Sequence, residues 1–461
     1  MTTSPYKGIK ETRVDRLSAL PDCLIIHILS LLEVKQSAIT SLLSKRWQFL
    51  WTQSPRLVFS EKRIRIQPRE VQDFVNRVNR TLVNYGRNDL DTFEVEFLYS
   101  KSYSPDVNVW VGFAVKNKAK QVSLLLNNII DEEDEEDENM YTLPRTMFRS
   151  ACLKRLKLRG CFVAPLGMIE WPSLTELHIK DSMLEQHVMD KMLQGCPVLR
   201  CLVLKYCWGF PRLEVSSKSL YELRVSDPKE GDFLVKPLLQ ISAPYLHTLW
   251  VSLDPIWKKF SLENTSSLVR ATIDFVKTGC WGVNARNMSN AKEILEKIRH
   301  VKVVDLRCNY IKVLSSVAIT DYRFPQSART CLSVEAPTVK CSIHGLVGLL
   351  ESSPNLEALV IKGYSTYADP CNCIDPKTDL DCDLLHLKSI IIKDFTSSNR
   401  VCEPMVTLAR ILLNKAPNLE KMVIHDIRFT SSSQFAGTES FKIAQKLLSY
   451  PKSSKAVILL K

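Results

Sequence analysis

The sequence is poor in glycine, with 14 glycines in 461 residues, or about 3% where ~7% is usual. No glycine is followed by lysine, and the patterns G-x-G, H-E-x-x-H and G-x-S-x-G do not occur. The phosphate-binding P-loop, the dinucleotide fingerprint, the zinc-protease helix and the serine-hydrolase turn each need one of these patterns. Enzymes built on these sites are therefore excluded.

The fourteen cysteines include no C-x-x-C pair, which most zinc fingers and thioredoxin-like proteins need. The nearest approach to a set of metal ligands is Cys371, Cys373, Cys382 and His386, and its spacing matches no common structural zinc site. The sequence therefore predicts no metal and no cofactor. We interpret the cysteines as small buried hydrophobic residues.

Long apolar stretches are also missing. No run of ~20 apolar residues could cross a bilayer, and the N-terminal sequence MTTSPYKGIKETRVDR lacks the apolar core of a secretory signal. We expect no membrane partner and an intracellular location, in the nucleus and/or cytoplasm, where thiols stay reduced.

Leucine and basic charge are plentiful. There are 60 leucines in 461 residues, about 13%, and an excess of leucine with few glycines indicates stacked repeats. The net charge is +12, although residues 131–138 (DEEDEEDE) hold eight of the 50 acids, so the other 453 residues carry +20. The basic charge therefore belongs to the folded part, and we expect the acidic run to be a solvated loop.

Residues 16–60 predict a compact helical unit. Pro21 and Asp22 suit the first turn of a helix, because proline is tolerated there and a carboxylate is favoured at the positive end. A second helical stretch is expected over residues 37–50. The apolar side chains of the two stretches include Leu24, Ile28, Leu31, Leu32, Trp47, Leu50 and Trp51. So short a unit cannot bury them all, and the excess predicts a partner-binding face.

The stretch LPDCLIIHILSLLEVKQSAITSLLSKRWQFLWTQSPRLVF, residues 20–59, closely resembles the F-box of plant proteins, in which L-S-K-R-W and a following L-W precede a hydrophobic strand. The resemblance implies binding to the Skp adaptor of a Skp–cullin–F-box ubiquitin ligase. The Skp-binding residues that it implies are Leu20, Pro21, Leu24, Ile28, Leu29, Leu32, Trp47 and Trp51. The alternative interpretation is a generic three-helix bundle.

From about Leu90 the pattern L-x-x-L-x-L takes over. It occurs ten times between Leu153 and Ile424, after two earlier strands at 90–95 and 119–124. Successive first positions from Leu153 to Leu268 are 21, 25, 21, 26 and 22 residues apart, within the range of leucine-rich repeats. Each unit predicts a short parallel strand with its leucines in the core and the intervening residues on the concave face, with helical segments between the strands.

The phrases WPSLTELHIKDS and GCPVLRCLVLKYC closely resemble repeats of plant F-box/leucine-rich-repeat proteins, and the last 80 residues look like the FBD module that often ends such chains. The expected fold class is therefore α/β, a helical F-box followed by a leucine-rich-repeat solenoid. The expected divisions are a disordered tail (1–15), the F-box (16–60), linker helices and a first repeat (61–118), leucine-rich repeats (119–380, with an acidic loop at 131–139) and an FBD-like cap (381–461). The cap would end in a helix at 442–450 and a strand at 456–460.

Two positions just after the strands stand out. Cys161, Cys207 and Asn309 fall where such repeats turn away from the strand, and we expect them to be structural. The residue directly after the last apolar position is Lys or Arg in six of the ten units. Aligned in a stack, these side chains would form a basic stripe that binds an acidic or phosphorylated target; the alternative is ordinary solubilising charge. Arg155 and Lys157 in the first unit would reinforce the stripe. The predicted target-binding residues are therefore Arg155, Lys157, Arg159, Lys180, Lys205, Arg307, Lys362 and Lys393.

The sequence and the resemblance together predict a non-catalytic substrate receptor of a ubiquitin ligase, whose partners are Skp, cullin through Skp, and a target protein. Ligase activity of the zinc type would need paired cysteines, so any such activity must come from partners. The competing interpretation is a leucine-rich-repeat scaffold or inhibitor that acts without ubiquitination. Nucleic acid is not expected as a partner, because the basic residues are spread over the repeats and not clustered with aromatic residues.

Overall fold

The computed structural model describes residues 17–460 except 18, 62–66, 129–138, 166, 211, 227–237, 254–258, 276–284, 321, 338–341, 365–379, 394–395, 398–399, 402, 426–444, 446 and 451–454. Residues 131–138 of the predicted acidic loop, residues 442–444 and 446 of the predicted helix at 442–450, and Cys371 and Cys373 lie outside the described residues. The chain divides into two compact units, Met1–Leu174 and Thr175–Lys461.

The first unit begins with short helices. These are α1 (Asp22–Ser30), α2 (Val34–Ile39) and the 3₁₀ turns η1 (Thr40–Leu42) and η2 (Leu50–Gln53). The expected single helix over 37–50 is therefore wrong. The hydroxyl groups of Thr40 and Ser41 each donate a 2.6 Å hydrogen bond to a backbone carbonyl three residues earlier, and such side-chain bonds compete with helical backbone bonding.

Parallel strands follow in the same unit, connected by two longer helices. The strands pair in the order β1 (Arg56–Ser60), β2 (Thr92–Tyr99), β3 (Gln121–Asn128) and β5 (Arg155–Arg159). Helices α3 (Pro68–Val83) and α4 (Ser104–Lys116) lie between them in sequence, and the rings of Phe74 and Phe97 stack with centroids 5.4 Å apart. The strands predicted at 90–95 and 119–124 are confirmed. Strand β1 was not predicted as part of the sheet, and it follows the short helices directly.

Short elements complete the first unit: η3 (Lys101–Tyr103), β4 (Tyr141–Thr142), η4 (Arg145–Arg149) and β6 (Cys161–Val163). Tyr141, on β4, is fully buried, and its hydroxyl donates a 2.8 Å hydrogen bond to Asn108 of α4.

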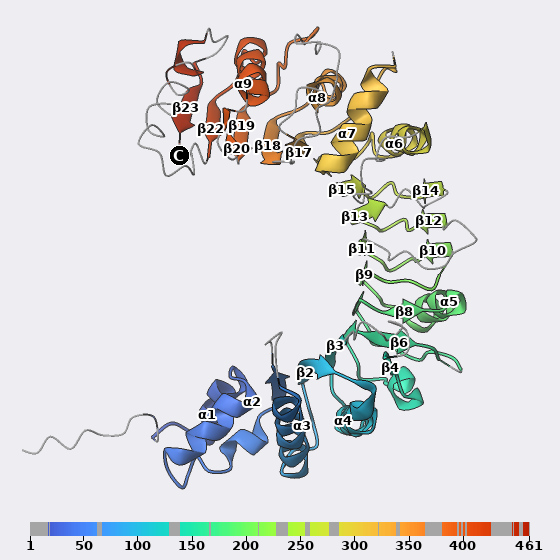
Figure 1. Ribbon diagram of the computed structural model, residues 1–461, viewed down its shortest axis with the longest axis vertical. Helices are drawn as coiled ribbons and strands as arrows, with labels where there is room; N and C mark the ends of the chain where they lie inside the picture. Colours follow the sequence, from blue (N-terminus) through green and yellow to red (C-terminus); the bar gives the residue numbers. More distant parts are fainter. Residues whose placement is uncertain are drawn as a thin grey trace, which may run out of the picture. The chain divides into compact units, whose positions relative to one another are not determined.

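The second unit is a ladder of parallel strands (Figure 1). In pairing order they are β7 (Glu176–Lys180), β9 (Cys201–Lys205), β11 (Glu222–Ser226), β13 (Thr248–Leu253), β15 (Arg270–Phe275), β16 (Val303–Leu306), β17 (Cys331–Pro337), β18 (Ala358–Tyr364), β19 (Ser389–Lys393), β22 (Lys421–Ile424) and β23 (Val457–Leu460). All ten predicted repeat units contain a strand, and the strand predicted at 456–460 is present. Strand β17 was not predicted.

The leucines of the repeat align across the strands as expected. Leu177, Leu202, Leu223 and Leu249 are in register, and each is buried. Because side chains alternate along a strand, the intervening residues lie on the opposite face of the sheet. The sequence pattern therefore corresponds to a leucine-rich-repeat solenoid.

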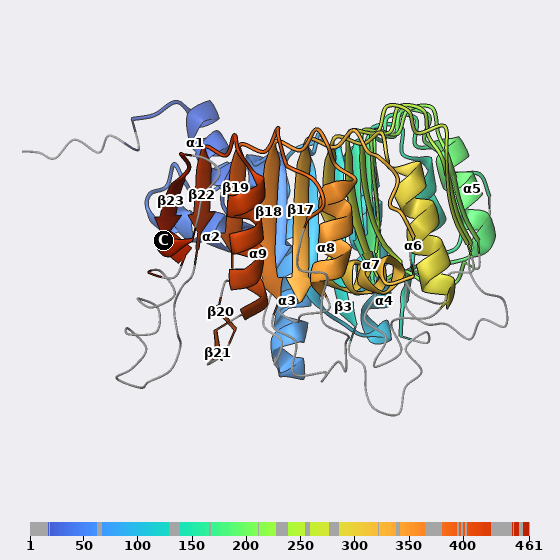
Figure 2. The ribbon, with the colours of Figure 1, turned by 90° about the horizontal axis from the view of Figure 1, so that it is seen from above.

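Helices return the chain in some repeats, as predicted. They are α5 (Gln186–Gly195), α6 (Ala285–Lys297), α7 (Cys308–Ala318), α8 (Ser342–Glu351) and α9 (Glu403–Lys415). Figure 2 shows α8 and α9 against one face of the strands. Two smaller pieces are β8 (Met183–Leu184) and the antiparallel pair β20 (Thr396–Ser397) and β21 (Arg400–Val401).

Three repeats return through strands instead, so the expectation of helices between the strands fails there. Strands β10 (Arg212–Ser216), β12 (Leu238–Ser242) and β14 (Lys259–Glu263) form a second parallel sheet. Buried residues alternate along them, as Leu213 and Val215 do on β10, and this period of two is that of a strand.

The residues after the strands are structural, as predicted. Asn309 donates a 2.8 Å hydrogen bond from its side chain to the Phe275 carbonyl at the end of β15. Cys161 and Cys207 are buried, and burial raises the pKa of each thiol to about 12. Both thiols therefore stay protonated and unreactive at neutral pH.

Candidate protein-binding surfaces

Apolar side chains are exposed over the helical N-terminal part of the first unit. Leu24 is 48% exposed and Leu42 is 85% exposed, whereas Ile25 and Leu29 of the same helix α1 are buried. We call this surface the apolar face. Its members are Leu24, Ile28, Leu31, Ile39, Leu42, Leu43 and Phe49. So many large apolar side chains exposed on one short segment are typical of an interaction site.

The structure divides the eight residues predicted for adaptor binding. Leu24, Ile28 and Pro21 are exposed, and Leu20, Leu32 and Trp51 are half-buried. Leu29 and Trp47 are buried together with Ile25 in the core, so their expected direct contact with a partner is wrong. They support the face from inside because a unit this small needs its largest apolar side chains as a core.

The predicted adaptor-binding residues omit five members of the apolar face, which are Leu31, Ile39, Leu42, Leu43 and Phe49; of these, only Leu31 was among the apolar side chains from which a partner-binding face was predicted. Their hydrophobicity was visible, but the expected long second helix would have turned some of them inward. In the structure the chain changes from α2 to the turn η1 at Thr40, and this change leaves Leu42 and Leu43 in solvent.

The S-K-R-W stretch holds the start of α1 in place. Arg46 lies 2.5 Å from the Asp22 carboxylate and also donates to the Leu20 carbonyl. Asp22 is in the first turn of α1, where the helix dipole stabilises a carboxylate. Trp47, the next residue, is buried below. This stretch therefore ties the residues before η2 to the start of α1.

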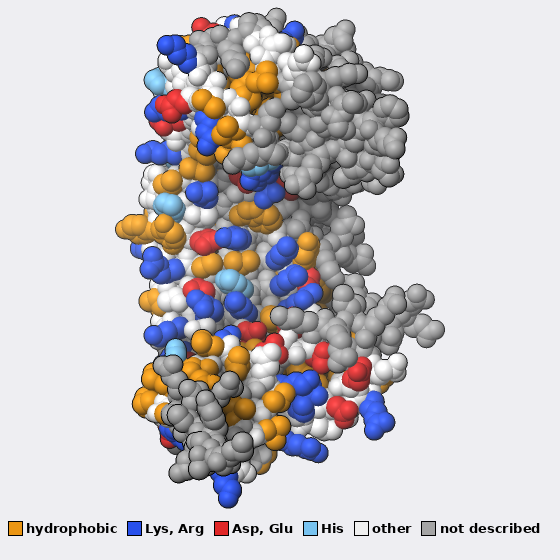
Figure 3. All heavy atoms as spheres, turned by 90° about the vertical axis from the view of Figure 1, so that its left-hand side faces the viewer, with side chains coloured by type: hydrophobic (Ala, Val, Ile, Leu, Met, Phe, Trp, Pro, Cys, Tyr) orange, Lys and Arg blue, Asp and Glu red, His pale blue; other side chains and the backbone are white. Residues whose placement is uncertain are grey.

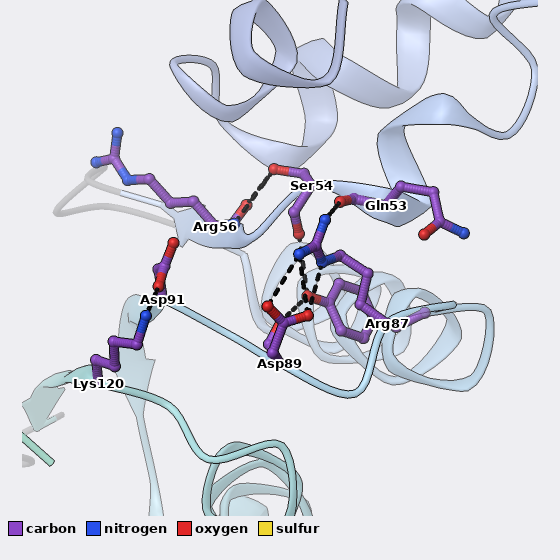
Figure 4. A network of polar contacts seen from close by, with 8 residues as sticks. Gln53, Ser54, Arg56, Arg87, Asp89, Asp91 and Lys120 are labelled. Atoms are coloured by element: carbon purple, nitrogen blue, oxygen red, sulfur yellow. Dashed lines mark hydrogen bonds and ion pairs between the residues drawn. The ribbon is translucent and has the colours of Figure 1, made fainter. Parts of the chain in front are cut away.

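A network of polar contacts connects this helical part to the strands that follow it (Figure 4). Arg87 donates a 3.2 Å hydrogen bond to the Gln53 carbonyl and pairs with Asp89. The Lys120 ammonium lies 2.6 Å from the Asp91 carboxylate. The Arg87 contacts join the segments on both sides of β1, and the Lys120–Asp91 pair joins the starts of β2 and β3.

The second candidate surface is the solvent-facing side of the strands. Figure 3 shows Lys and Arg side chains on this side scattered among hydrophobic and acidic ones. On β5, Arg155 donates to the Gln121 side chain at 3.1 Å, Lys157 is in register with Ser123, and Arg159 is in register with Leu125.

The predicted basic stripe is interrupted in the second unit. Arg307, on the row directly after the strand cores, lies 2.9 Å from Glu335 and 3.8 Å from Asp305. Burial alone would lower the pKa of Arg307, but the hydrogen bond to Glu335 and the nearby carboxylates raise it. Much of the charge of Arg307 is therefore offset locally, and its role in binding an acidic target stays a prediction. Glu335 lies on β17, the strand that the sequence analysis missed.

Two lysine pairs remain at separate places in this row. Lys180 and Lys205 are in register on β7 and β9, and Lys362 and Lys393 are in register on β18 and β19. The Nζ atoms of Lys180 and Lys205 lie 5.7 Å and 4.9 Å from the centre of the Tyr206 ring. The structure thus brings the predicted lysines together in pairs and not in one stripe.

Comparisons with known proteins agree with the description of the helical N-terminal part and with that of the repeats. An F-box domain model matches residues 17–59, the segment that carries the apolar face. A model of the leucine-rich repeats of "FBD-associated F-box protein At5g56370" matches residues 108–274. The chain is thus similar to F-box domains in its first part and to the repeats of an FBD-associated F-box protein in residues 108–274.

Proteins similar to this chain over most of its length are found in Arabidopsis thaliana. F-box/LRR-repeat protein At4g14096 is 29% identical over 97% of this chain and 94% of its own length. F-box/LRR-repeat protein At3g59210 is 28% identical over 89% of this chain and 88% of its own. Proteins with an F-box are typically substrate receptors of Skp–cullin–F-box ubiquitin ligases. Within the described residues, no helix of this protein is long and apolar enough to cross a membrane.

Proposed function

We propose that this protein is the substrate-recognition subunit of a Skp–cullin–F-box ubiquitin ligase. The F-box binds the Skp adaptor and, through it, cullin, and the repeats hold a target protein. The subunit performs no chemistry itself: it raises the effective concentration of the target's lysines near a ubiquitin-charged enzyme. Such a receptor acts inside the cell, in the nucleus and/or cytoplasm.

The observation that carries the proposal is the apolar face. Leu24 and Ile28 on α1, Leu31 directly after α1, and Leu42 and Leu43 after α2 stay exposed. Burying such a side chain completely from full exposure contributes about 1.5–3 kcal/mol, and these partly exposed ones would contribute a corresponding share against a partner. The face lies within the segment matched by the F-box model, and exposed apolar surface of this kind marks an interaction site.

Co-purification with a Skp homologue tests the proposal. We expect the full chain to bring down the adaptor, and the double substitution Leu24→Asp and Ile28→Asp to abolish this, because two carboxylates would be desolvated in the interface. Leu20→Ala with Pro21→Ala should weaken it. Val109→Asp is the matched control, because Val109 is 63% exposed on α4, outside the F-box segment.

The second candidate is a leucine-rich-repeat scaffold or inhibitor that acts without ubiquitination. It would be favoured if the full chain bound a target but never a Skp homologue, and that result would overturn the ligase proposal. The FBD-like cap at 381–461 remains a prediction; the described strands β19, β22 and β23 in this segment continue the ladder.

A further inference from the structure

Tyr206 adopts a backbone conformation that tyrosine rarely takes. Its φ angle is +53°, in the left-handed region, which costs most residues roughly 1–2 kcal/mol. The corresponding residue after strand β7 is Asp181, with φ +45°, and aspartate is enriched in this region. The turn therefore requires a left-handed residue, but it does not require an aromatic one.

The side chain of Tyr206 makes contacts that an aspartate at this position could not make. It lies within 6 Å of two ammonium groups, those of Lys180 and Lys205, and contacts between a cation and an aromatic ring at exposed sites are weakly attractive. The two lysines are in register on neighbouring strands, ~4.8 Å apart. The ring thus holds two like charges side by side.

Local carboxylates offset only part of this charge. The Asp181 carboxylate lies 3.6 Å from Lys180 Nζ, and both side chains are partly exposed. Within the described part of the chain, Asp181 is the acid that forms an ion pair with this lysine pair. Ser226, the next residue along the same row, is in register with Lys205 and is neutral. An anion with two negative charges would match the two ammonium groups better than one carboxylate does.

We propose that Lys180, Lys205 and Tyr206 form a phosphate-binding clip that takes a phosphorylated serine or threonine of the target. A phosphate monoester carries about −1.5 to −2 charges at pH 7 and three acceptor oxygens, which allows one oxygen for each ammonium group. The Tyr206 ring forms one wall of the clip. This inference rests on the proposed function of the repeats as the target-binding part, and it names the chemistry of the target.

The structure offers a matched control. Lys362 and Lys393 are a second lysine pair in the same register relationship, on β18 and β19. Among the described residues, no aromatic ring lies over either of them. A response specific to the clip is therefore distinguishable from a general response to basic charge.

The test measures retention of degenerate peptide libraries on the immobilised full chain. Three libraries have a central phosphoserine, a central serine or a central aspartate. We expect the phosphoserine library to be retained roughly tenfold better than the serine library. Lys180→Gln with Lys205→Gln should remove most of this preference, and Lys362→Gln with Lys393→Gln should leave it within about twofold.

Tyr206 supplies a second readout. Tyr206→Phe keeps the ring and should keep the preference, whereas Tyr206→Leu should reduce it at an unchanged melting temperature. Lowering the pH from 7.5 to 5.5 should weaken retention of the phosphoserine library, because the second phosphate pKa is about 6, and should leave the aspartate library unchanged.

Three results would overturn the clip: equal retention of the phosphoserine and serine libraries, no effect of the Lys180 and Lys205 substitutions, or an equal loss in the control pair. Better retention of the aspartate library would point to a carboxylate instead and would also overturn it. Adaptor co-purification is scored separately. A chain that binds Skp but not the phosphopeptides refutes only the clip, and a chain that binds phosphopeptides but not Skp refutes only the ligase role.

Discussion

The hydroxyl group of Tyr85 donates a 3.0 Å hydrogen bond to the backbone carbonyl of Ser54. This bond ties the loop after α3 to the last residues before β1, and the bond from Arg87 to the Gln53 carbonyl lies beside it. Strand β1 in turn pairs with β2. The F-box is therefore bonded to the first strands without a free linker, and both belong to the same compact unit. For a substrate receptor, such a joint would keep the adaptor-binding face in a constant relation to the first repeats.

Loosening this joint should be measurable. Arg87→Ala removes the bond to Gln53 and the pair with Asp89, and we expect a loss of about 1 kcal/mol and faster amide exchange at residues 52–57. Hydrogen exchange read by mass spectrometry measures the effect. Arg69→Ala, at an exposed position on α3, is the control and should leave exchange unchanged. Equal exchange in the two variants would show that β1 pairing alone holds the joint.

Tyr85 should make the protein sensitive to alkaline pH. Burial raises the pKa of Tyr85 to about 12, from an ordinary value of 10.0. The folded state therefore holds the phenolic proton more tightly than the unfolded state. The stability that this provides is complete below pH 10 and is lost as the pH rises towards 12. Unfolding by urea at pH 9, 10 and 11 should show a steeper decline for the natural protein than for Tyr85→Phe; parallel declines would contradict the assignment.

Helix α1 has a core side and an exposed side, so alanine substitutions of its two leucines should differ in their effects on stability and on adaptor binding. Leu29→Ala should cost about 2–5 kcal/mol, because Leu29 is 1% exposed and its removal leaves a cavity. Leu24→Ala should change stability by less than about 0.5 kcal/mol and yet weaken adaptor binding. Urea unfolding and adaptor co-purification give the two readouts. A large loss of stability from Leu24→Ala would show that this side of α1 belongs to the core.

The strands of the repeats could be predicted from the sequence because their leucines recur at positions that must align in a stack. The side on which a residue of a short helical unit lies could not be predicted as well. Leu29 and Trp47 fit the same apolar pattern as Leu24, and only tertiary packing decides which of them form the core. The lysine pairs illustrate the same limit: position within the repeat predicted their row, but much of the charge of Arg307 is offset by Glu335, on a strand that the pattern did not reveal.

Strand β17 escaped prediction because arginine stands where its first leucine should be. The register of Leu332 with Leu359 and of Val334 with Ile361 makes Arg329 equivalent to Leu356. The side chain is 1% exposed, and within the described part of the chain its three guanidinium nitrogens have no hydrogen-bond partner. Burial lowers the pKa of Arg329 to about 10. A buried charge in this state opposes folding.

Replacing Arg329 by an apolar residue should therefore stabilise the protein. We expect Arg329→Met, which keeps the length of the side chain, and Arg329→Leu, which restores the repeat pattern, to raise the free energy of unfolding by about 1–4 kcal/mol. Because the folded state favours the neutral form of Arg329, the natural protein recovers stability as the pH approaches and passes 10. The advantage of Arg329→Met over the natural protein should accordingly shrink between pH 8 and pH 11, measured by urea unfolding. Arg323→Met, at an exposed position, is the control and should change little at any pH. If Arg329→Met instead destabilised the protein by several kcal/mol, the guanidinium group would have to be held by a bonded partner, and the interpretation of Arg329 as an uncompensated charge would be wrong.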